Sequence, residues 1–196
     1  MSLKGQRTTT TSLDWDQFRS LVAKLERDGN YKYCLLVAIG VFTGLRISDL
    51  LQLRFSDFEG TDILTIQERK TGKTRRIKIN NDLKVLVSRI KEKMHPNNSN
   101  QLIFLNRYGT KTIGTSWINV SLKQIFKKYD IVIDGNISTH FLRKTMANRV
   151  LKLNNYSNEA VILLMELFSH SSPAITRRYL GLREREIQDV YDSLRL

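Results

Sequence analysis

Residues 138–181 read STHFLRKTMANRVLKLNNYSNEAVILLMELFSHSSPAITRRYLG, and we expect the rest of the chain to be arranged around them. His140 and Arg143 stand three residues apart, so on a helix they project as neighbours. His170 follows the next apolar helix at a Ser/Pro turn, and Tyr179 comes nine residues later, near the end of a short helix. Two imidazoles, a guanidinium and a phenol at these intervals predict a site that binds a phosphate group and attacks it.

A further segment with a charged pair lies upstream of this stretch. Residues 43–51 read TGLRISDLL and place Arg46 three positions before Asp49. Such a pair is by itself more typical of a surface ion pair, which contributes little to stability. Here it directly follows the apolar run 33–42, where a charged pair must be satisfied or functional.

These segments resemble the signature motifs of tyrosine recombinases, the phage-integrase-like enzymes. The matching segments are His140-x-x-Arg143, residues 168–172 with the second histidine and Tyr179 as the nucleophile, residues 43–51 with the first arginine, and the hairpin lysine in Lys70-Thr71-Gly72-Lys73. The resemblance runs from about Ser12 to the C-terminus, and the motifs occur in the family's order. Each motif is weakly specific, whereas the ordered set is strongly specific.

The chain departs from the family pattern in three respects. Ser169 stands where glycine commonly precedes the second histidine, and Lys144 stands where an imidazole often follows the second arginine. Relatives usually carry an N-terminal domain that closes around DNA. We expect residues 1–11 to form a flexible arm or linker and residues 12–196 to form the catalytic domain, without that N-terminal domain. The chain is therefore expected to be a fragment or a truncated enzyme, and we do not expect it to recombine DNA alone.

Composition points to a polyanionic partner. The 196 residues contain 32 Lys+Arg against 19 Asp+Glu, a net charge of +13. Such an excess favours nucleic acid or an anionic membrane surface, and the alternative is a solvated basic surface without a partner. Cys34 is the single cysteine and excludes an intrachain disulfide framework, while three histidines argue against structural zinc. The longest apolar run, Cys34–Phe42, is far below the roughly 18 residues of a membrane span, so we expect a cytoplasmic, nucleoid-associated protein.

Periodicity predicts one mainly α-helical domain with a small antiparallel β-sheet, an α+β fold. Two alternating segments, 62–67 and 76–79, predict strands around a turn at 71–74, and 51–58 predicts a third. Helices are expected after a cap at Ser12 or Asp14, over 33–42, after Asn80 or Asn81, after Gly109, from His140, over 158–168, from Pro173 and at the C-terminus. In the helix from His140, we expect Leu142, Met146, Val150 and Leu153 to face inward.

Each candidate side chain suits one step of an attack on a phosphodiester. Guanidinium groups stay protonated and bind two oxygens, so Arg46 and Arg143 are expected to clamp the phosphate, with Asp49 orienting Arg46. His140 is expected to accept the proton of the Tyr179 hydroxyl, His170 to donate to the phosphate and Lys70 to protonate the leaving oxygen. No metal or cofactor is expected. The residues expected to contact DNA are Arg69, Lys73, Arg75, Lys144, Arg177 and Arg178.

The resemblance implies the catalytic domain of a site-specific DNA recombinase (integrase) from a mobile genetic element. It would cleave and rejoin double-stranded DNA through a 3′-phosphotyrosine at Tyr179, and would act as a homo-tetramer that uses the C-terminal helix. The alternatives are a non-cleaving DNA-binding module of the same fold and strand relaxation of the type IB topoisomerase kind. Individually, His140 is more typical of a helix cap, and the basic tip 69–75 is either a solvated turn or a finger for a DNA groove.

Overall fold

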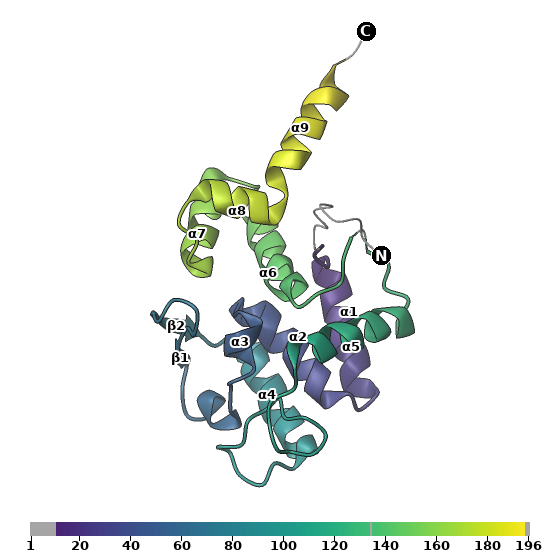
Figure 1. Cartoon of the computed structure of the whole chain (residues 1–196), viewed down its shortest axis with the longest axis vertical. Helices are drawn as coiled ribbons and strands as arrows, with labels where there is room; N and C mark the ends of the chain where they lie inside the picture. The colour runs from purple at the N-terminus through teal and green to yellow at the C-terminus, as the bar shows by residue number, and fades with distance from the viewer. Residues whose placement is uncertain (1–10, 134, 195–196) are drawn as a thin grey trace. The chain divides into compact units, whose positions relative to one another are not determined.

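The computed structural model describes residues 11–133 and 135–194, and the predicted arm at 1–11 lies almost entirely outside them (Figure 1). Contacts group the chain into two compact units, one formed by residues 10–146 and the other mainly by residues 147–196. The boundary falls within helix α6, His140–Leu153. The prediction of a single catalytic domain over 12–196 stays a prediction.

The core of the first unit is centred on α2, which packs against α1 and α4. Helix α1, Trp15–Arg27, begins at a capping box in which Asp14 accepts from the Gln17 amide at 2.7 Å and Gln17 accepts from the Asp14 amide at 3.1 Å. Helix α2, Tyr31–Thr43, is apolar around most of its circumference, so it packs in the centre of the unit. Helix α4, Asn81–Met94, is capped by Asn80 and also packs on α2.

A charged cluster joins α1 to α4 at the edge of this core. Glu26 on α1 accepts two hydrogen bonds from Arg89, at 2.7 and 2.8 Å, and one from Lys93 at 2.9 Å. The Arg89 hydrogen bonds are the main reason that the pKa of Glu26 falls to about 2, with Lys93 adding to the shift against partial burial. The cluster therefore keeps its charges throughout the neutral range.

The remaining parts of the first unit are a hairpin, two short helical segments and a long helix. Strands β1, Ile63–Gln67, and β2, Thr74–Lys78, pair antiparallel with Leu64 opposite Ile77, as predicted for this sheet. Helix α3 covers Ile47–Leu50, and α5 covers Thr115–Lys128. The predicted third strand over 51–58 is wrong, because Phe55–Phe58 form a 3-10 helix and Arg54 makes only an isolated bridge to Leu102.

In the second unit, the described residues form the end of α6 and three further helices joined by tight turns. Helix α7, Asn158–Phe168, is capped by Ser157, and α8, Pro173–Leu180, is capped by Ser172 with proline at its first turn. Gly181 ends α8 in the left-handed conformation, at φ 70°, and α9 follows as Leu182–Ser193. Helices α7 and α8 were predicted with these caps, and the C-terminal helix was predicted from its amphipathic pattern.

The predicted inward face of α6 is only partly correct. Leu142 is buried, but Leu153 is 64% exposed, and Met146 and Val150 are half-buried. The exposure of these predicted core residues increases towards the end of the helix, where Leu153 is followed directly by the turn that leads to α7. Within the described ranges, no helix has the length and apolar character needed to cross a membrane.

Candidate active site

The turn after α2 brings the two predicted clamp arginines together. Gly44 ends α2 in the left-handed conformation, at φ 59°, and Arg46 stands two residues later. Arg143 of α6 is buried, 5% exposed, and its Nη1 donates to the Gly44 carbonyl at 2.8 Å. Carbonyls at a helix C-terminus lack intrahelical partners and carry partial negative charge, so a guanidinium is well suited to them. Arg46 and Arg143 are thus tied to one turn of the chain.

A buried carboxylate, Glu68, holds Arg46 from the hairpin side. Its Oε2 lies 2.8 Å from Nη1 of Arg46, and its Oε1 lies 3.8 Å from Nη1 of Arg75. The Thr71 hydroxyl donates to Oε2 at 2.8 Å. Burial by itself would raise the pKa of Glu68, but the hydrogen bonds from Thr71 and Arg46 and the charges of both arginines outweigh it, so the pKa is lowered. Glu68 is therefore an ionised acid inside a strongly basic protein.

Arg75 completes this cluster. The prediction that it belongs to the exposed basic tip is therefore wrong. Its Nη2 donates to the Thr43 carbonyl at 2.9 Å, and its side chain is only 12% exposed. The Thr43 carbonyl thus accepts a hydrogen bond from Arg75 of β2, and the Gly44 carbonyl accepts one from Arg143 of α6. Desolvation is the main cause that lowers the pKa of Arg75, opposed by the charge of Glu68.

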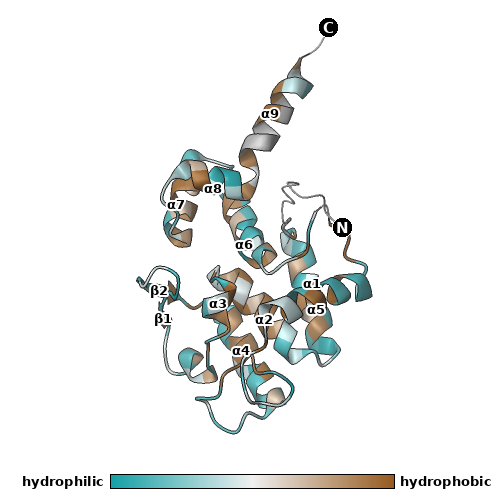
Figure 2. Cartoon of the chain, in the orientation of Figure 1, coloured by the Kyte–Doolittle hydropathy of each residue, from teal (hydrophilic) through white to brown (hydrophobic). Residues whose placement is uncertain are grey.

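Asp49 contacts the start of the hairpin turn that carries Lys70. Asp49 on α3 is 4% exposed, so it is not half of a surface ion pair, and its Oδ1 accepts from the Arg69 amide at 3.0 Å and from the Ser48 hydroxyl at 3.3 Å. Asp49 therefore fixes the start of the turn that carries Lys70. Lys70 itself is exposed between β1 and β2, where Figure 2 shows a hydrophilic segment. That Asp49 orients Arg46 stays a prediction.

His140 is the first residue of α6, one turn before Arg143. The amide of Thr139 donates to Oδ1 of Asn119 on α5 at 3.0 Å, which fixes the start of the helix. Although His140 keeps an exposed surface, partial desolvation of its ring and the positive charges of Arg143 and Lys144 lower its pKa. The neutral imidazole is therefore favoured at neutral pH, as a proton acceptor requires.

In the second unit, two aromatic rings, those of Phe168 and His170, pack against the predicted nucleophile. The ring centroids of His170 and Tyr179 are 5.3 Å apart, and Phe168 lies 5.6 Å from His170 and 5.8 Å from Tyr179, all edge to face. Nδ1 of His170 lies 3.0 Å from the hydroxyl of the fully buried Thr176. When the hydroxyl donates, the ring proton resides on Nε2, which suits His170 as a donor to phosphate.

The backbone conformation of Ser169 explains why glycine is common before the second histidine in the family that the sequence resembles. It ends α7 in the left-handed conformation, at φ 52°. This region carries a steric cost of roughly 1–2 kcal/mol for residues with a Cβ, and glycine avoids it. The backbone amide of His170 then donates to the Met165 carbonyl at 2.9 Å, so the turn holds the histidine at the end of the helix.

The predicted catalytic residues divide between the two units. Arg46, Lys70, His140 and Arg143 belong to the first unit, and His170 and Tyr179 belong to the second. Within the first unit, the structure ties Arg46 and Arg143 to one turn. Within the second unit, it places His170 beside Tyr179. The meeting of all six side chains around one phosphate stays a prediction.

The residues predicted to contact DNA are only partly at the surface. Arg69, Lys73 and Arg178 are exposed, and Arg177 donates to Oδ1 of Asn158 at 2.5 Å. Lys144 is only 8% exposed, because it follows Arg143 on the buried part of α6. Like Arg75, it is therefore not displayed on the surface as expected. Glu68 and Thr176 were missed by the sequence analysis.

Comparison with known proteins gives the family. The model described as the phage integrase family matches residues 11–186. The chain belongs to the phage integrase family. The "Probable integrase/recombinase YoeC" of Bacillus subtilis (strain 168) is 30% identical over 162 residues, which cover 83% of this chain and 84% of that relative. A "Tyrosine recombinase" of Agathobacter rectalis is 26% identical over 150 residues, which cover 76% of this phage integrase family member and 47% of the relative.

Solved structures place the fold of this family member among tyrosine recombinase catalytic domains. The XerA recombinase structure has a TM-score of 0.67 at 21% identity, covering 97% of this chain and 68% of that one. XerH recombinase, in a post-cleavage complex with palindromic difH substrate, has a TM-score of 0.66 at 18% identity, covering 93% of this chain and 53% of XerH. A lambda integrase dimer bound to a COC′ core site has a TM-score of 0.65 at 18% identity. The phage integrase family chain spans about half the length of the XerH and lambda integrase chains.

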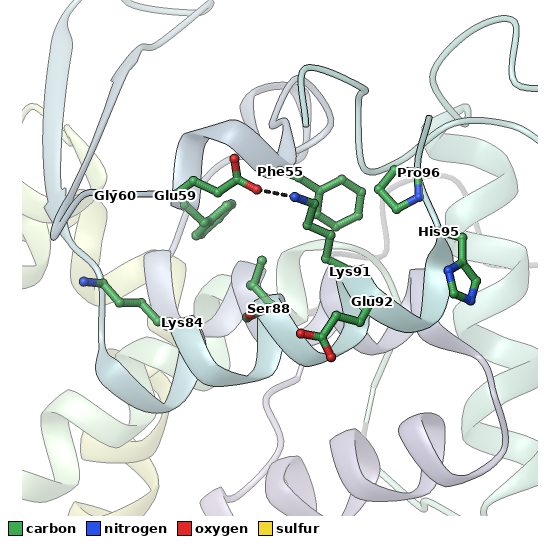
Figure 3. A pocket seen from close by; sticks show the side chains of 11 residues that line it. Phe55, Glu59, Gly60, Lys84, Ser88, Lys91, Glu92, His95 and Pro96 are labelled. Carbon is green, nitrogen blue, oxygen red and sulfur yellow. Dashed lines mark hydrogen bonds and ion pairs between the residues drawn. The ribbon is translucent and has the colours of Figure 1, made fainter. Parts of the chain in front are cut away.

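The first unit of the family member also contains a pocket of about 510 Å³, which is not lined by the predicted catalytic residues (Figure 3). It shares no lining residue with the predicted site. Lys91 reaches across it to Glu59, as the dashed line in Figure 3 shows, and Lys84 pairs with Asp62. The charges of its lysines are therefore matched by carboxylates, and nothing in the lining favours an anion.

Proposed function

We propose that this chain is the catalytic domain of a site-specific recombinase that cleaves and rejoins double-stranded DNA through a covalent 3′-phosphotyrosine at Tyr179. The observation that carries the proposal is the turn 43–46, to which Arg46 and Arg143 are both tied in a member of the phage integrase family. The edge-to-face pair of His170 and Tyr179 supports it from the second unit.

The two arginines serve the charge that develops during the reaction. In-line attack on a phosphodiester places additional negative charge on the non-bridging oxygens of the pentacoordinate transition state. Guanidinium groups remain protonated and present parallel donors, so Arg46 and Arg143 stabilise that charge without a metal ion. Because Arg143 is held by the Gly44 carbonyl and Arg46 by Glu68, both groups are positioned before DNA binds.

Proton transfer is divided among three residues. The phenol of Tyr179, whose ordinary pKa is about 10, loses its proton to His140 as it attacks. The lowered pKa of His140 keeps its imidazole unprotonated and ready for this step. His170 donates to the phosphate, and Lys70 on the exposed turn protonates the departing 5′-oxygen. The phosphotyrosine conserves the energy of the broken bond, so a 5′-hydroxyl from another strand completes the exchange without ATP.

DNA is the partner that the surface charge favours. The net charge of +13 attracts a polyanion, and Arg69 and Lys73 are exposed at the hairpin turn beside Lys70. Relatives of the same fold have been solved on DNA, among them XerH on difH and a lambda integrase dimer on its core site. We infer an oligomer on DNA, a tetramer in the full reaction, joined through the exposed apolar residues of α9, namely Ile187, Val190 and Tyr191. A mobile genetic element as source and association with the nucleoid belong to the same proposal.

A trapping experiment tests the covalent step without knowledge of the target site. The chain is incubated with a pool of nicked suicide duplexes whose sequence is randomised, and covalent adducts are separated on a denaturing gel and sequenced. We expect an adduct that enriches a defined sequence and disappears in Tyr179→Phe. Tyr156→Phe is the matched control, because Tyr156 is exposed in the turn before α7, and it should retain the adduct.

The outcomes separate the alternatives. DNA binding without an adduct in any enzyme preparation refutes cleavage and supports a non-cleaving module of the same fold. An adduct that persists in Tyr179→Phe refutes the assignment of the nucleophile. Relaxation of supercoiled plasmid without strand exchange between two duplexes supports the topoisomerase-like activity instead.

A further inference from the structure

Glu68 is a buried acid with an unusual set of partners. Its side chain is 1% exposed, although it directly follows a strand with three exposed residues and precedes a basic turn. It contacts Arg46 at 2.8 Å, Thr71 at 2.8 Å and Arg75 at 3.8 Å. These contacts join a residue of the proposed phosphate clamp to the turn that carries the proposed general acid.

Stability alone is a poor explanation for such a group. Desolvating an ion pair costs about as much as the attraction between the charges returns, so buried pairs are often no better than apolar residues of similar volume. A buried carboxylate does, however, fix the geometry of its partners. A guanidinium has five N–H donors in one plane, so a carboxylate on Nη1 orients that plane and leaves the group able to bind a phosphate.

The backbone of the same segment shows that the turn is fixed as well. The Glu68 amide donates to the Lys73 carbonyl at 2.9 Å, and the Gly72 amide donates to the Glu68 carbonyl at 2.8 Å. The Arg69 amide donates to Asp49 at 3.0 Å, and the Thr71 hydroxyl donates to the Glu68 side chain. The residues on both sides of Lys70 are therefore tied to the segment that contains Arg46.

We propose that Glu68 is a positioning residue for the cleavage reaction: it orients the guanidinium of Arg46 and couples it, through Thr71, to the Lys70 turn. The proposal rests on the function proposed above. Its first consequence concerns the charge on the non-bridging oxygens, because that charge is bound by Arg46. Loss of the carboxylate should therefore slow cleavage more than it weakens DNA binding.

The test is Glu68→Gln, which preserves the shape of the side chain and removes its charge. We expect its cleavage rate on the enriched suicide substrate to fall by about 10- to 100-fold, the scale expected when a reacting group is misplaced by about 1 Å. We expect DNA affinity to stay within about threefold and the urea unfolding transition to remain cooperative. Glu92→Gln is the matched control, since it makes the same change at an exposed position of α4, and its cleavage rate should equal that of the wild type.

A substrate with sulfur in place of the 5′-bridging oxygen identifies which group is affected. Sulfur leaves without a proton, so this substrate corrects a defect in Lys70 but not a defect in Arg46. We expect Glu68→Gln to remain slow on the sulfur substrate, whereas Lys70→Ala recovers. Full recovery of Glu68→Gln on sulfur, or cleavage within twofold of the wild type on oxygen, overturns the proposal.

A measurement that needs no catalysis keeps this inference separate from the proposed function. In ¹⁵N-arginine NMR spectra, a guanidinium held by an ion pair gives distinct Nη signals because rotation about its Cζ–Nε bond is slowed. We expect the distinct Arg46 signals to merge in Glu68→Gln, and unchanged signals overturn the proposal even when the wild type forms no adduct. If Glu68→Gln fails to fold, Thr71→Val should cleave several-fold more slowly than Thr71→Ser, and equal rates overturn it.

Discussion

Replacing Gly40 with alanine should destabilise the protein although it removes a glycine from a helix. A Cβ at position 40 of α2 would lie 2.7 Å from Cδ1 of Leu142 on α6, 3.2 Å from its Cβ and 3.3 Å from its Cγ. Leu142 is 1% exposed, so its side chain has little room to move aside. Glycine to alanine in a helix interior gains about 1 kcal/mol, while overpacking of a core costs typically about 1–3 kcal/mol. The net expectation is a loss of about 0–2 kcal/mol.

Urea unfolding of a double-mutant cycle measures the clash itself. In the Leu142→Ala background Cδ1 and Cγ are gone and only the 3.2 Å contact with the Cβ of residue 142 remains, so Gly40→Ala should be less destabilising there than in the wild type. Gly114→Ala is the control, because no atom lies within 4 Å of its added Cβ, and its effect should be the same in both backgrounds. Stabilisation by Gly40→Ala in the wild type, or equal effects in both backgrounds, would refute the close approach of α2 and α6.

The same substitution should affect catalysis beyond its effect on stability. The contact at the Leu142 Cβ cannot be relieved by a rotamer change, so α6 must move by a few tenths of an ångström. Helix α6 also carries His140 and Arg143. We therefore expect Gly40→Ala to slow formation of the covalent adduct at temperatures where the protein remains fully folded, as circular dichroism can verify.

Three further predictions concern pH, the arginine cluster and a backbone turn. Cleavage should persist as pH falls to 6.5 and decline only below it, because the lowered pKa of His140 preserves the unprotonated base; a rate already halved at pH 6.5 or above would contradict this. Arg75→Lys should reduce the unfolding free energy by about 1–2 kcal/mol, since lysine lacks the planar donors that reach Thr43 and Glu68, while DNA affinity measured by fluorescence anisotropy stays unchanged. Gly181→Ala should cost about 1–2 kcal/mol in thermal unfolding through its φ of 70° alone, and no loss would show that the turn relaxes.

Most of the helical fold was predictable because its signals are local. Asp14, Asn80, Ser157 and Ser172 each accept a hydrogen bond from an amide two or three residues ahead, so the sequence itself contains the partner. The false third strand over 51–58 shows the opposite case. Its apolar alternation fits a strand, but a strand also needs a partner along its length, which sequence spacing does not provide.

One local signal did indicate the true conformation of that segment. Asp57 accepts from the Arg54 amide at 2.7 Å and so caps the 3-10 turn that begins at Phe55. An acid three residues after the first position is a typical feature of a helical start.

The site was predictable in its motifs and less so in its surroundings. The order of the motifs led to Arg46 and Arg143, which the structure ties to one turn. Arg75 was misplaced although it shares a face of β2 with Ile77, and this period of two indicates an inward position. Glu68 lies beside a basic turn and therefore looks like a solvated residue in the sequence. Its burial depends on the packing of the hairpin against distant segments.

Arg143 serves the fold as well as the proposed chemistry, because its guanidinium occupies the Gly44 carbonyl at the end of the most apolar helix. Removing it would leave a buried acceptor without its donor, a penalty of about 1–3 kcal/mol that is independent of any reaction. A descendant that no longer cut DNA would still be under selection to retain this residue. An arginine at this position in a homologue is therefore weak evidence of activity. The residue at position 179 distinguishes homologues that cleave DNA from inactive ones better.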